Sequence, residues 1–117
     1  MTRKIPFFNY PDLFNGQREE LLPVITGVLE RGAYIMQEDL FKFEVELANF
    51  LDVKHAIGVA DGTMALVMSL RAAGIGEGDE VIVPSHTFVA SAAAIHHVGA
   101  TPMLADCGRD HLITADS

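Results

Sequence analysis

The chain has 117 residues, half of them hydrophobic, and a formal net charge of −8 at pH 7. This acidic balance argues against nucleic acid and anionic membranes as partners, because both require a basic surface. The single cysteine, Cys107, cannot form an internal disulfide, which fits a reducing cytoplasm. No segment is long and apolar enough to span a bilayer, and we expect no signal peptide.

The first part of the chain is predicted to be an irregular N-terminal arm, residues 1–16. These residues are rich in aromatic side chains and show neither a helical nor an alternating pattern. We expect the aromatic side chains to pack on another surface, such as a second subunit.

Two helices are predicted after this arm. The first begins near 17–20 and ends at Arg31, with Gly32 as its cap, although Pro23 leaves the start open by several residues. The second spans 38–51, where apolar residues recur at helical spacing on one face. We interpret this second helix as a packed structural element.

The remaining sequence alternates between strand and helix patterns. Strands are predicted at 55–60, 80–84 and 101–105, with helices at 62–73 and 87–98 between them. Strands separated by helices of this length are typical of right-handed βαβ units around a parallel sheet. The sequence therefore predicts an α/β fold.

Three polar segments directly follow the predicted strands, namely Asp61-Gly62-Thr63, Ser85–Phe88 and Asp106. Ligands of parallel α/β sheets bind at the carboxyl ends of the strands, so these segments are expected to share one edge. The first of them opens a helix, whose free N–H groups and positive dipole end attract anions such as phosphate. This edge is the candidate binding site.

The same residues also have purely structural interpretations. Asp61, Gly62 and Thr63 are ordinary residues for a turn and a helix cap, and Asp106 can cap a turn. Phe88 can stack on a heteroaromatic cofactor or pack in the core. The residues alone leave these alternatives open.

Metal and nucleophilic sites are not expected. His96 and His97 are adjacent and point about 100° apart on a helix, so they cannot bind one ion together, and no cluster has metal-ligand spacing. Cys107 has no evident activating partner, and none of the three lysines lies at the end of a core strand. For His86 we expect an orienting or surface role.

Several motifs together resemble the DegT/StrS family. They are Gly32-Ala-Tyr-Ile35, Phe43-Glu44, the run from His55 to Leu66, the run from Gly78 to Ser91, and Gly99-Ala-Thr-Pro-Met-Leu-Ala-Asp106. Members of this family are pyridoxal-phosphate (PLP)-dependent nucleotide-sugar aminotransferases with the aspartate-aminotransferase fold (fold type I). The resemblance implies that residues 17–117 are the N-terminal part of the PLP-binding large domain, with a parallel or mixed βαβ sheet.

The resemblance also implies roles for individual residues. Gly62 and Thr63 match the pair that holds the cofactor phosphate, and Phe88 matches the aromatic that stacks on the pyridine ring. We include Asp61 among the cofactor-binding residues, although Asn or Ser is frequent there. Tyr34 and Ile35 match a segment near the sugar and the dimer interface. Family members are homodimers that usually take the amino group from glutamate.

Length is the large departure from the family, whose chains are about three times longer. The Schiff-base lysine and the acid that pairs with the pyridine nitrogen belong to the part without a counterpart here, so no catalytic residue is assigned. We expect an N-terminal fragment that is inactive alone. The alternatives are a non-catalytic module for phosphate-ligand binding or dimerisation, and the sugar-dehydratase branch of the same family.

Overall fold

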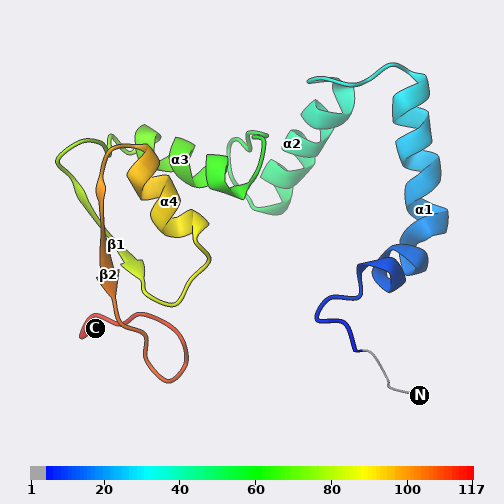
Figure 1. Cartoon of the computed structure of the whole chain (residues 1–117). Coiled ribbons are helices and arrows are strands. Elements are labelled where there is room, and N and C mark those ends of the chain that lie inside the picture. The colour runs from blue at the N-terminus through cyan, green and yellow to red at the C-terminus, as the bar shows by residue number, and fades with distance from the viewer. Residues whose placement is uncertain (1–4) are drawn as a thin grey trace. The chain divides into compact units, whose positions relative to one another are not determined.

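The computed structural model describes residues 5–117, so Lys4 and the start of the predicted arm lie outside the described residues. The chain divides into two compact units, one ending at Gly58 and the other beginning at Val59. Figure 1 shows the elements in chain order. Each unit is described by itself below.

The first helix, α1 (Tyr10–Glu30), begins well before the position predicted from the sequence. Residues 10–16 are therefore helical, and the expectation of an irregular segment there is wrong. Proline is favourable in a first turn because its missing N–H would have no partner there. Pro11 and Asp12 in the first turn were the signal for this start. The interior Pro23 is accommodated without ending the helix, and α1 buries none of its residues.

A tight turn ends α1 and leads through a short loop to α2 (Glu38–Phe50). The Gly32 N–H donates to Leu29 O at 2.9 Å and the Ala33 N–H to Val28 O at 3.2 Å. Gly32 has φ +69°, which a residue without Cβ adopts readily. This pairing is the Schellman motif, which satisfies the last carbonyls of a helix.

Residues 55–60 do not form the predicted strand. A strand needs a neighbouring strand to pair with, and β1 (Glu80–Pro84) and β2 (Thr101–Ala105) pair with each other instead. The Gly58 N–H donates to Glu44 Oε1 of α2 at 2.7 Å. A side chain therefore accepts the hydrogen bond that a neighbouring strand would accept in a sheet. The prediction of a strand at 55–60 is therefore wrong for this chain.

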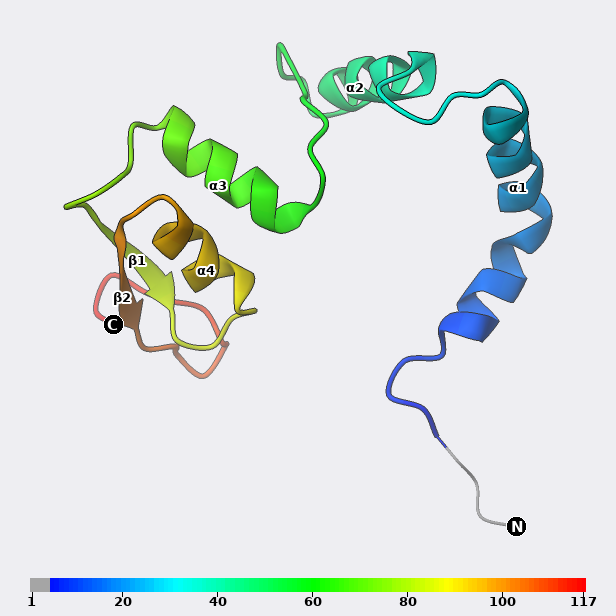
Figure 2. The same ribbon diagram turned by 45° about the horizontal axis from the view of Figure 1, so that its top comes forward.

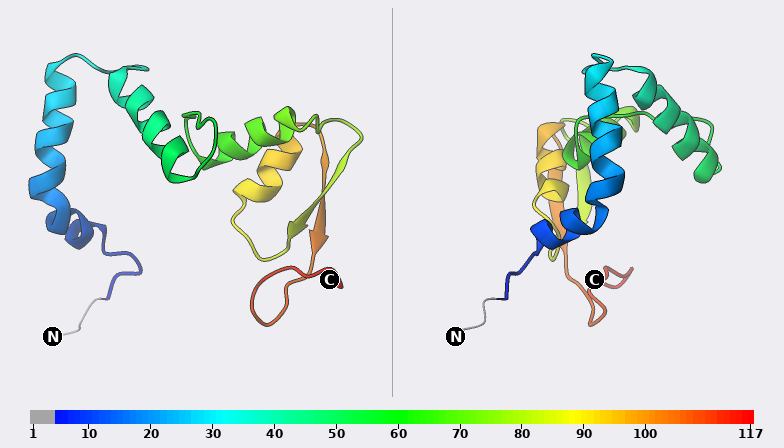
Figure 3. Two further views of the ribbon diagram at one scale, coloured as in Figure 1. Left: turned by 180° about the vertical axis from the view of Figure 1, so that it is seen from behind. Right: turned by 90° about the vertical axis from the view of Figure 1, so that its right-hand side faces the viewer.

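The second unit contains two helices and a two-stranded parallel sheet. They are α3 (Gly62–Ala72), β1 (Glu80–Pro84), α4 (Ala90–His97) and β2 (Thr101–Ala105). The strands have the predicted bounds and pair in parallel from Glu80 with Thr101 to Pro84 with Ala105. Figure 2 shows both helices running opposite to the strands, and Figure 3 shows the same for α4 seen from behind. Their N-termini therefore lie toward the carboxyl ends of β1 and β2.

The helix α4 begins later than predicted and covers one face of the sheet. The hydroxyl groups of Thr87 and Ser91 form a hydrogen bond of 3.1 Å, and the Ser91 N–H donates to Phe88 O at 3.0 Å. These contacts form a turn that precedes the helix. Val83, Ile95 and Ala100 form the buried centre, with partly buried apolar side chains around it, namely Leu70, Ile75, Val81 and Val98. This small cluster holds the βαβ unit together.

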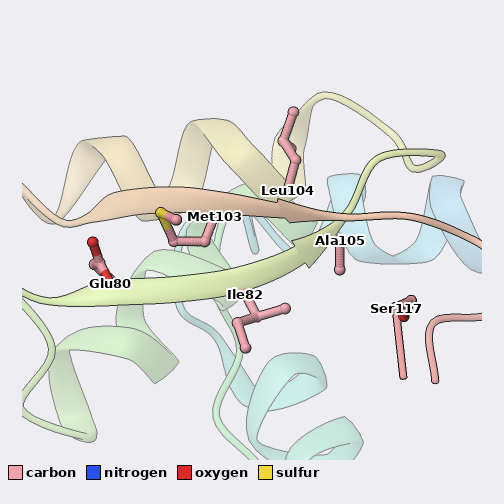
Figure 4. A pocket seen from close by; sticks show the side chains of 6 residues that line it. All are labelled: Glu80, Ile82, Met103, Leu104, Ala105 and Ser117. Carbon is pink, nitrogen blue, oxygen red and sulfur yellow. The ribbon is translucent and has the colours of Figure 1, made fainter. Parts of the chain in front are cut away.

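The other face of the sheet is open. Ile82 is 69% exposed and lies beside Met103 in the register of the two strands. These side chains line a hollow of about 370 Å³ with Glu80, Leu104, Ala105 and Ser117. Figure 4 shows Leu104 pointing to the opposite side of its strand from Ala105. Parallel sheets are normally covered on both faces, so this face is incomplete within the chain.

Two negative observations apply to the described residues, 5–117. None of their helices combines the length and apolar character that crossing a membrane requires. Within the same range, no three His, Cys, Asp or Glu side chains gather as a metal-binding group.

Candidate functional site

The start of α3 is organised by Asp61. This residue is the N-cap and has an extended backbone, with φ −164° and ψ 177°. Its Oδ1 accepts a hydrogen bond from the Met64 N–H at 2.9 Å, and its carbonyl accepts one from the Ala65 N–H at 3.0 Å. The capping interpretation of Asp61 is thus realised in the structure.

Two backbone N–H groups of the first turn remain without a helical partner, because no earlier turn supplies carbonyl groups for the first N–H groups of a helix. These are the N–H groups of Gly62 and Thr63. A Cβ built on Gly62 would meet nothing within 4 Å, so space for a ligand lies beside this backbone. The half-buried Thr63 adds a hydroxyl donor next to them. Two N–H groups and one hydroxyl at a positive dipole end suit a phosphate.

Asp61 differs from Gly62 and Thr63 because its side chain carries a negative charge. Its carboxylate is satisfied by the Met64 N–H, and it carries the same sign as a phosphate. A like charge a few ångströms away weakens anion binding. Asp61 therefore shapes the turn while opposing the charge of an anion that Gly62 and Thr63 would hold.

Phe88 lies in the turn between β1 and α4, at the same end of the unit as the start of α3 (Figure 2). Its side chain is 76% exposed, so core packing, the structural alternative for this residue, does not occur within this chain. An exposed aromatic ring at a strand end offers a flat apolar surface on which a ring-shaped ligand can stack.

The other polar residues at these strand ends make local contacts. Asp106 Oδ1 accepts a hydrogen bond from the N–H of the next residue, Cys107, at 2.8 Å, which is a local contact and not a turn cap. The His86 ring meets the His111 ring edge-on, with centroids 5.3 Å apart. This contact agrees with an orienting or surface role for His86.

Tyr34 and Ile35 lie in the first unit, in the loop between α1 and α2. Their side chains are 72% and 77% exposed, and the neighbouring Met36 is 70% exposed. This loop therefore presents three large side chains to its surroundings. Met36 has φ +43°, a left-handed conformation that costs energy for a residue with a side chain.

Two contacts in the first unit were missed by the sequence analysis. The Arg31 guanidinium binds the carboxylate of Asp39 at 2.8 Å across the loop, and Glu44 holds the Gly58 N–H. Arg31 is the C-cap residue of α1 and Asp39 lies in the first turn of α2, so each charge also suits the end of its own helix. Each pair depends on how the chain folds back, which residue spacing alone does not reveal.

The comparison with known families gives a match over residues 15–116 to the DegT/DnrJ/EryC1/StrS aminotransferase family. This match includes α3, both strands and the loop with Tyr34. The chain belongs to this family. The predicted family and its α/β fold are confirmed.

Relatives of the chain have names that describe sugar transaminases. It is 42% identical over 110 residues to dTDP-3-amino-3,4,6-trideoxy-alpha-D-glucose transaminase of Streptomyces venezuelae, covering 94% of this chain and 29% of that protein. It is 42% identical over 102 residues to UDP-N-acetyl-3-dehydro-alpha-D-glucosamine 3-aminotransferase of Acidithiobacillus ferrooxidans, covering 87% and 28%. These relatives act on sugars linked to different nucleotides.

Solved structures of the same kind superpose well on the chain. S. venezuelae DesV in complex with a ketimine intermediate matches with a TM-score of 0.84 and 42% identity, covering 94% of this chain and 30% of that one. NtdA of Bacillus subtilis with bound cofactor PMP matches with a TM-score of 0.80 and 32% identity, covering 89% and 24%. The chain thus spans less than a third of the length of these relatives.

Proposed function

We propose that this chain is the N-terminal part of a PLP-dependent aminotransferase that converts a keto group on a nucleotide-linked deoxysugar into an amine. The family match over residues 15–116 is the observation that carries this proposal. The donors at the start of α3 support it independently, because they fit the phosphate of the cofactor. Amino sugars of this kind supply cell-envelope polysaccharides and antibiotics.

The residues of this chain would bind and orient the cofactor. The N–H groups of Gly62 and Thr63 and the Thr63 hydroxyl would hold its phosphate, and Phe88 would lie against its pyridine ring. When bound, PLP supplies an electron sink for bonds at the substrate's amino-bearing carbon. Asp61 would set the turn from which these donors project, and its own contact with the cofactor stays a prediction.

The substrate would meet the loop with Tyr34 and Ile35. A phenol ring and an aliphatic side chain suit the apolar C–H face of a deoxysugar, and the Tyr34 hydroxyl can pair with a sugar hydroxyl. We assign the amino-donor role to glutamate and propose a cytoplasmic homodimer. The Schiff-base lysine would come from outside these 117 residues.

The experiment begins with the coding DNA beyond the codon for Ser117. We expect an open frame that encodes an acidic residue at a strand end and, further on, a lysine in a serine-rich loop. The purified product should bind PLP and lose its visible absorbance when L-glutamate is added, as the cofactor becomes PMP.

The other outcomes separate the alternatives. A histidine in place of the lysine would favour the dehydratase branch, and a stop codon after Ser117 with a folded product would favour a non-catalytic module. A full-length product that binds PLP but does not react with any amino donor would contradict the transaminase assignment.

A further inference from the structure

We propose that Arg31 and Asp39 form a clasp that fixes the loop carrying Tyr34 and Ile35, and thereby set the affinity for the sugar substrate as positioning residues. The substrate part of this inference rests on the function proposed above. The clasp itself rests on the geometry of the first unit alone.

The clasp spans the loop from one helix end to the other. Arg31 is the C-cap residue of α1, and Asp39 is in the first turn of α2, eight positions later. Arg31 Nη2 donates to Asp39 Oδ1 at 2.9 Å and to Oδ2 at 2.8 Å. One guanidinium nitrogen therefore bridges both carboxylate oxygens, and the residues between are closed into a ring.

Arg31 is itself held at a second point. Its Nη1 donates to the carbonyl of Gly27 at 3.1 Å, one turn earlier in α1. A cation at a helix C-terminus and an anion at a helix N-terminus are each favoured by the helix dipole. The clasp therefore joins two groups that already suit their own helices.

The loop needs such support because little else fixes its second half. The N-cap residue Gln37 makes no side-chain hydrogen bond to cap α2. Met36 has φ +43°, a conformation that persists only where the surroundings impose it. The first half, in contrast, has the turn that ends α1 and a hydrogen bond from the Tyr34 N–H to Gly32 O at 3.1 Å.

The chain provides a matched control for the clasp. Lys42 Nζ lies 2.7 Å from Glu38 Oε1, in an ion pair whose side chains are 66% and 78% exposed, against 58% and 48% for the clasp. This pair joins positions i and i+4 of α2 and does not cross the loop. Exposed ion pairs contribute little to overall stability, so any difference between the two pairs reports on the loop.

The test compares Arg31→Ala, Asp39→Ala, the double variant and Lys42→Ala in the full-length polypeptide. The first readout is hydrogen exchange of the Ala33 and Tyr34 amides, which needs no ligand. We expect both single variants and the double variant to exchange about three- to fivefold faster, with no added effect in the double variant. Lys42→Ala should match the native protein. Unchanged exchange in Arg31→Ala, or an equal increase in Lys42→Ala, would overturn the clasp.

The second readout is the dissociation constant for UDP-glucose and dTDP-glucose, with KM and kcat for the substrate that is turned over. Loss of the clasp should raise the dissociation constant and KM about three- to fivefold and leave kcat and PLP retention unchanged. Faster exchange with unchanged affinity would overturn the substrate part of the inference. A native protein that binds PLP but turns over no UDP-, dTDP- or GDP-linked keto sugar would contradict the proposed function, while exchange would still decide the clasp.

Discussion

The two units of the chain use their apolar residues differently. Among the described residues, most buried hydrophobic side chains belong to the unit beginning at Val59. In the unit ending at Gly58, Ala48 is the buried hydrophobic residue among those described. In the second unit the consecutive elements β1, α4 and β2 form a complete βαβ unit, so α4 buries residues against the sheet. The helices of the first unit carry apolar side chains that remain exposed, such as Leu21 and Phe41. An apolar face at helical spacing therefore does not mean that this face is buried within the chain.

The largest expected effect is on the free energy of unfolding, in a comparison of one isoleucine from each unit. Ile95 in α4 is 3% exposed, whereas Ile25 in α1 is 48% exposed. Ile95→Ala should lower the free energy of unfolding by about 2–5 kcal/mol, because it opens a cavity in the core. Ile25→Ala should change it by less than about 0.5 kcal/mol in the 117-residue chain. Urea denaturation measures both, and equal losses would show that the first unit is as well packed as the second.

A smaller effect concerns an exposed residue in the packed unit. Phe88→Ala should weaken PLP binding by about 0.5–1.5 kcal/mol through lost stacking, while the free energy of unfolding stays the same. Phe41→Ala is the control, since Phe41 is an exposed phenylalanine of α2. PLP titrations of the full-length polypeptide measure the change. If Phe41→Ala weakened binding as much as Phe88→Ala did, stacking by Phe88 would lose its support.

The charge of Asp61 should have an effect of opposite sign. Asp61→Asn keeps an oxygen for the Met64 N–H and removes the negative charge, so PLP affinity should rise by at most about 1 kcal/mol, or fivefold. Asp79→Asn is a matched control, because Asp79 caps the Gly76 N–H in the same unit before β1 begins. Weaker PLP binding by Asp61→Asn would show that the carboxylate itself contacts the cofactor.

The smallest effect lies in the first unit and depends on pH. The hydrogen bond from Lys42 and its charge lower the pKa of Glu38 below its usual 4.5. The pair therefore supports α2 fully above pH 4.5, and this support is lost as the pH falls through the lowered pKa. Circular dichroism should show a slight loss of helix in that range, which salt and Lys42→Ala both remove. An unaltered titration in Lys42→Ala would rule out the pair as its cause.

The sequence predicted the second unit better than the first, for physical reasons. The strands at 80–84 and 101–105 have the expected bounds, because short apolar runs between glycine-rich turns are a strong local signal. Residues 55–60 were predicted as a strand, but strand pairing depends on a partner that the local pattern does not contain. The early start of α1 was missed because aromatic residues obscured the signal from Pro11.

The candidate site was predicted in position but less fully in chemistry. Helix-start and strand-end rules bring Gly62, Thr63 and Phe88 to one end of the second unit, and the structure has them there. The rules could not tell whether Asp61 would cap the helix or face a ligand, since both use the same carboxylate. The clasp of Arg31 and Asp39 could not be predicted, because it depends on the path of the loop.

The most direct test of the account is the PLP affinity of Thr63→Ala and Thr63→Ser in the full-length polypeptide. Losing one hydrogen bond to a charged phosphate should weaken binding by about 1.5–3 kcal/mol in Thr63→Ala. Thr63→Ser keeps the hydroxyl and should bind PLP nearly as well as the native protein. Equal affinity for PLP in the native protein and Thr63→Ala would contradict a phosphate site at the start of α3.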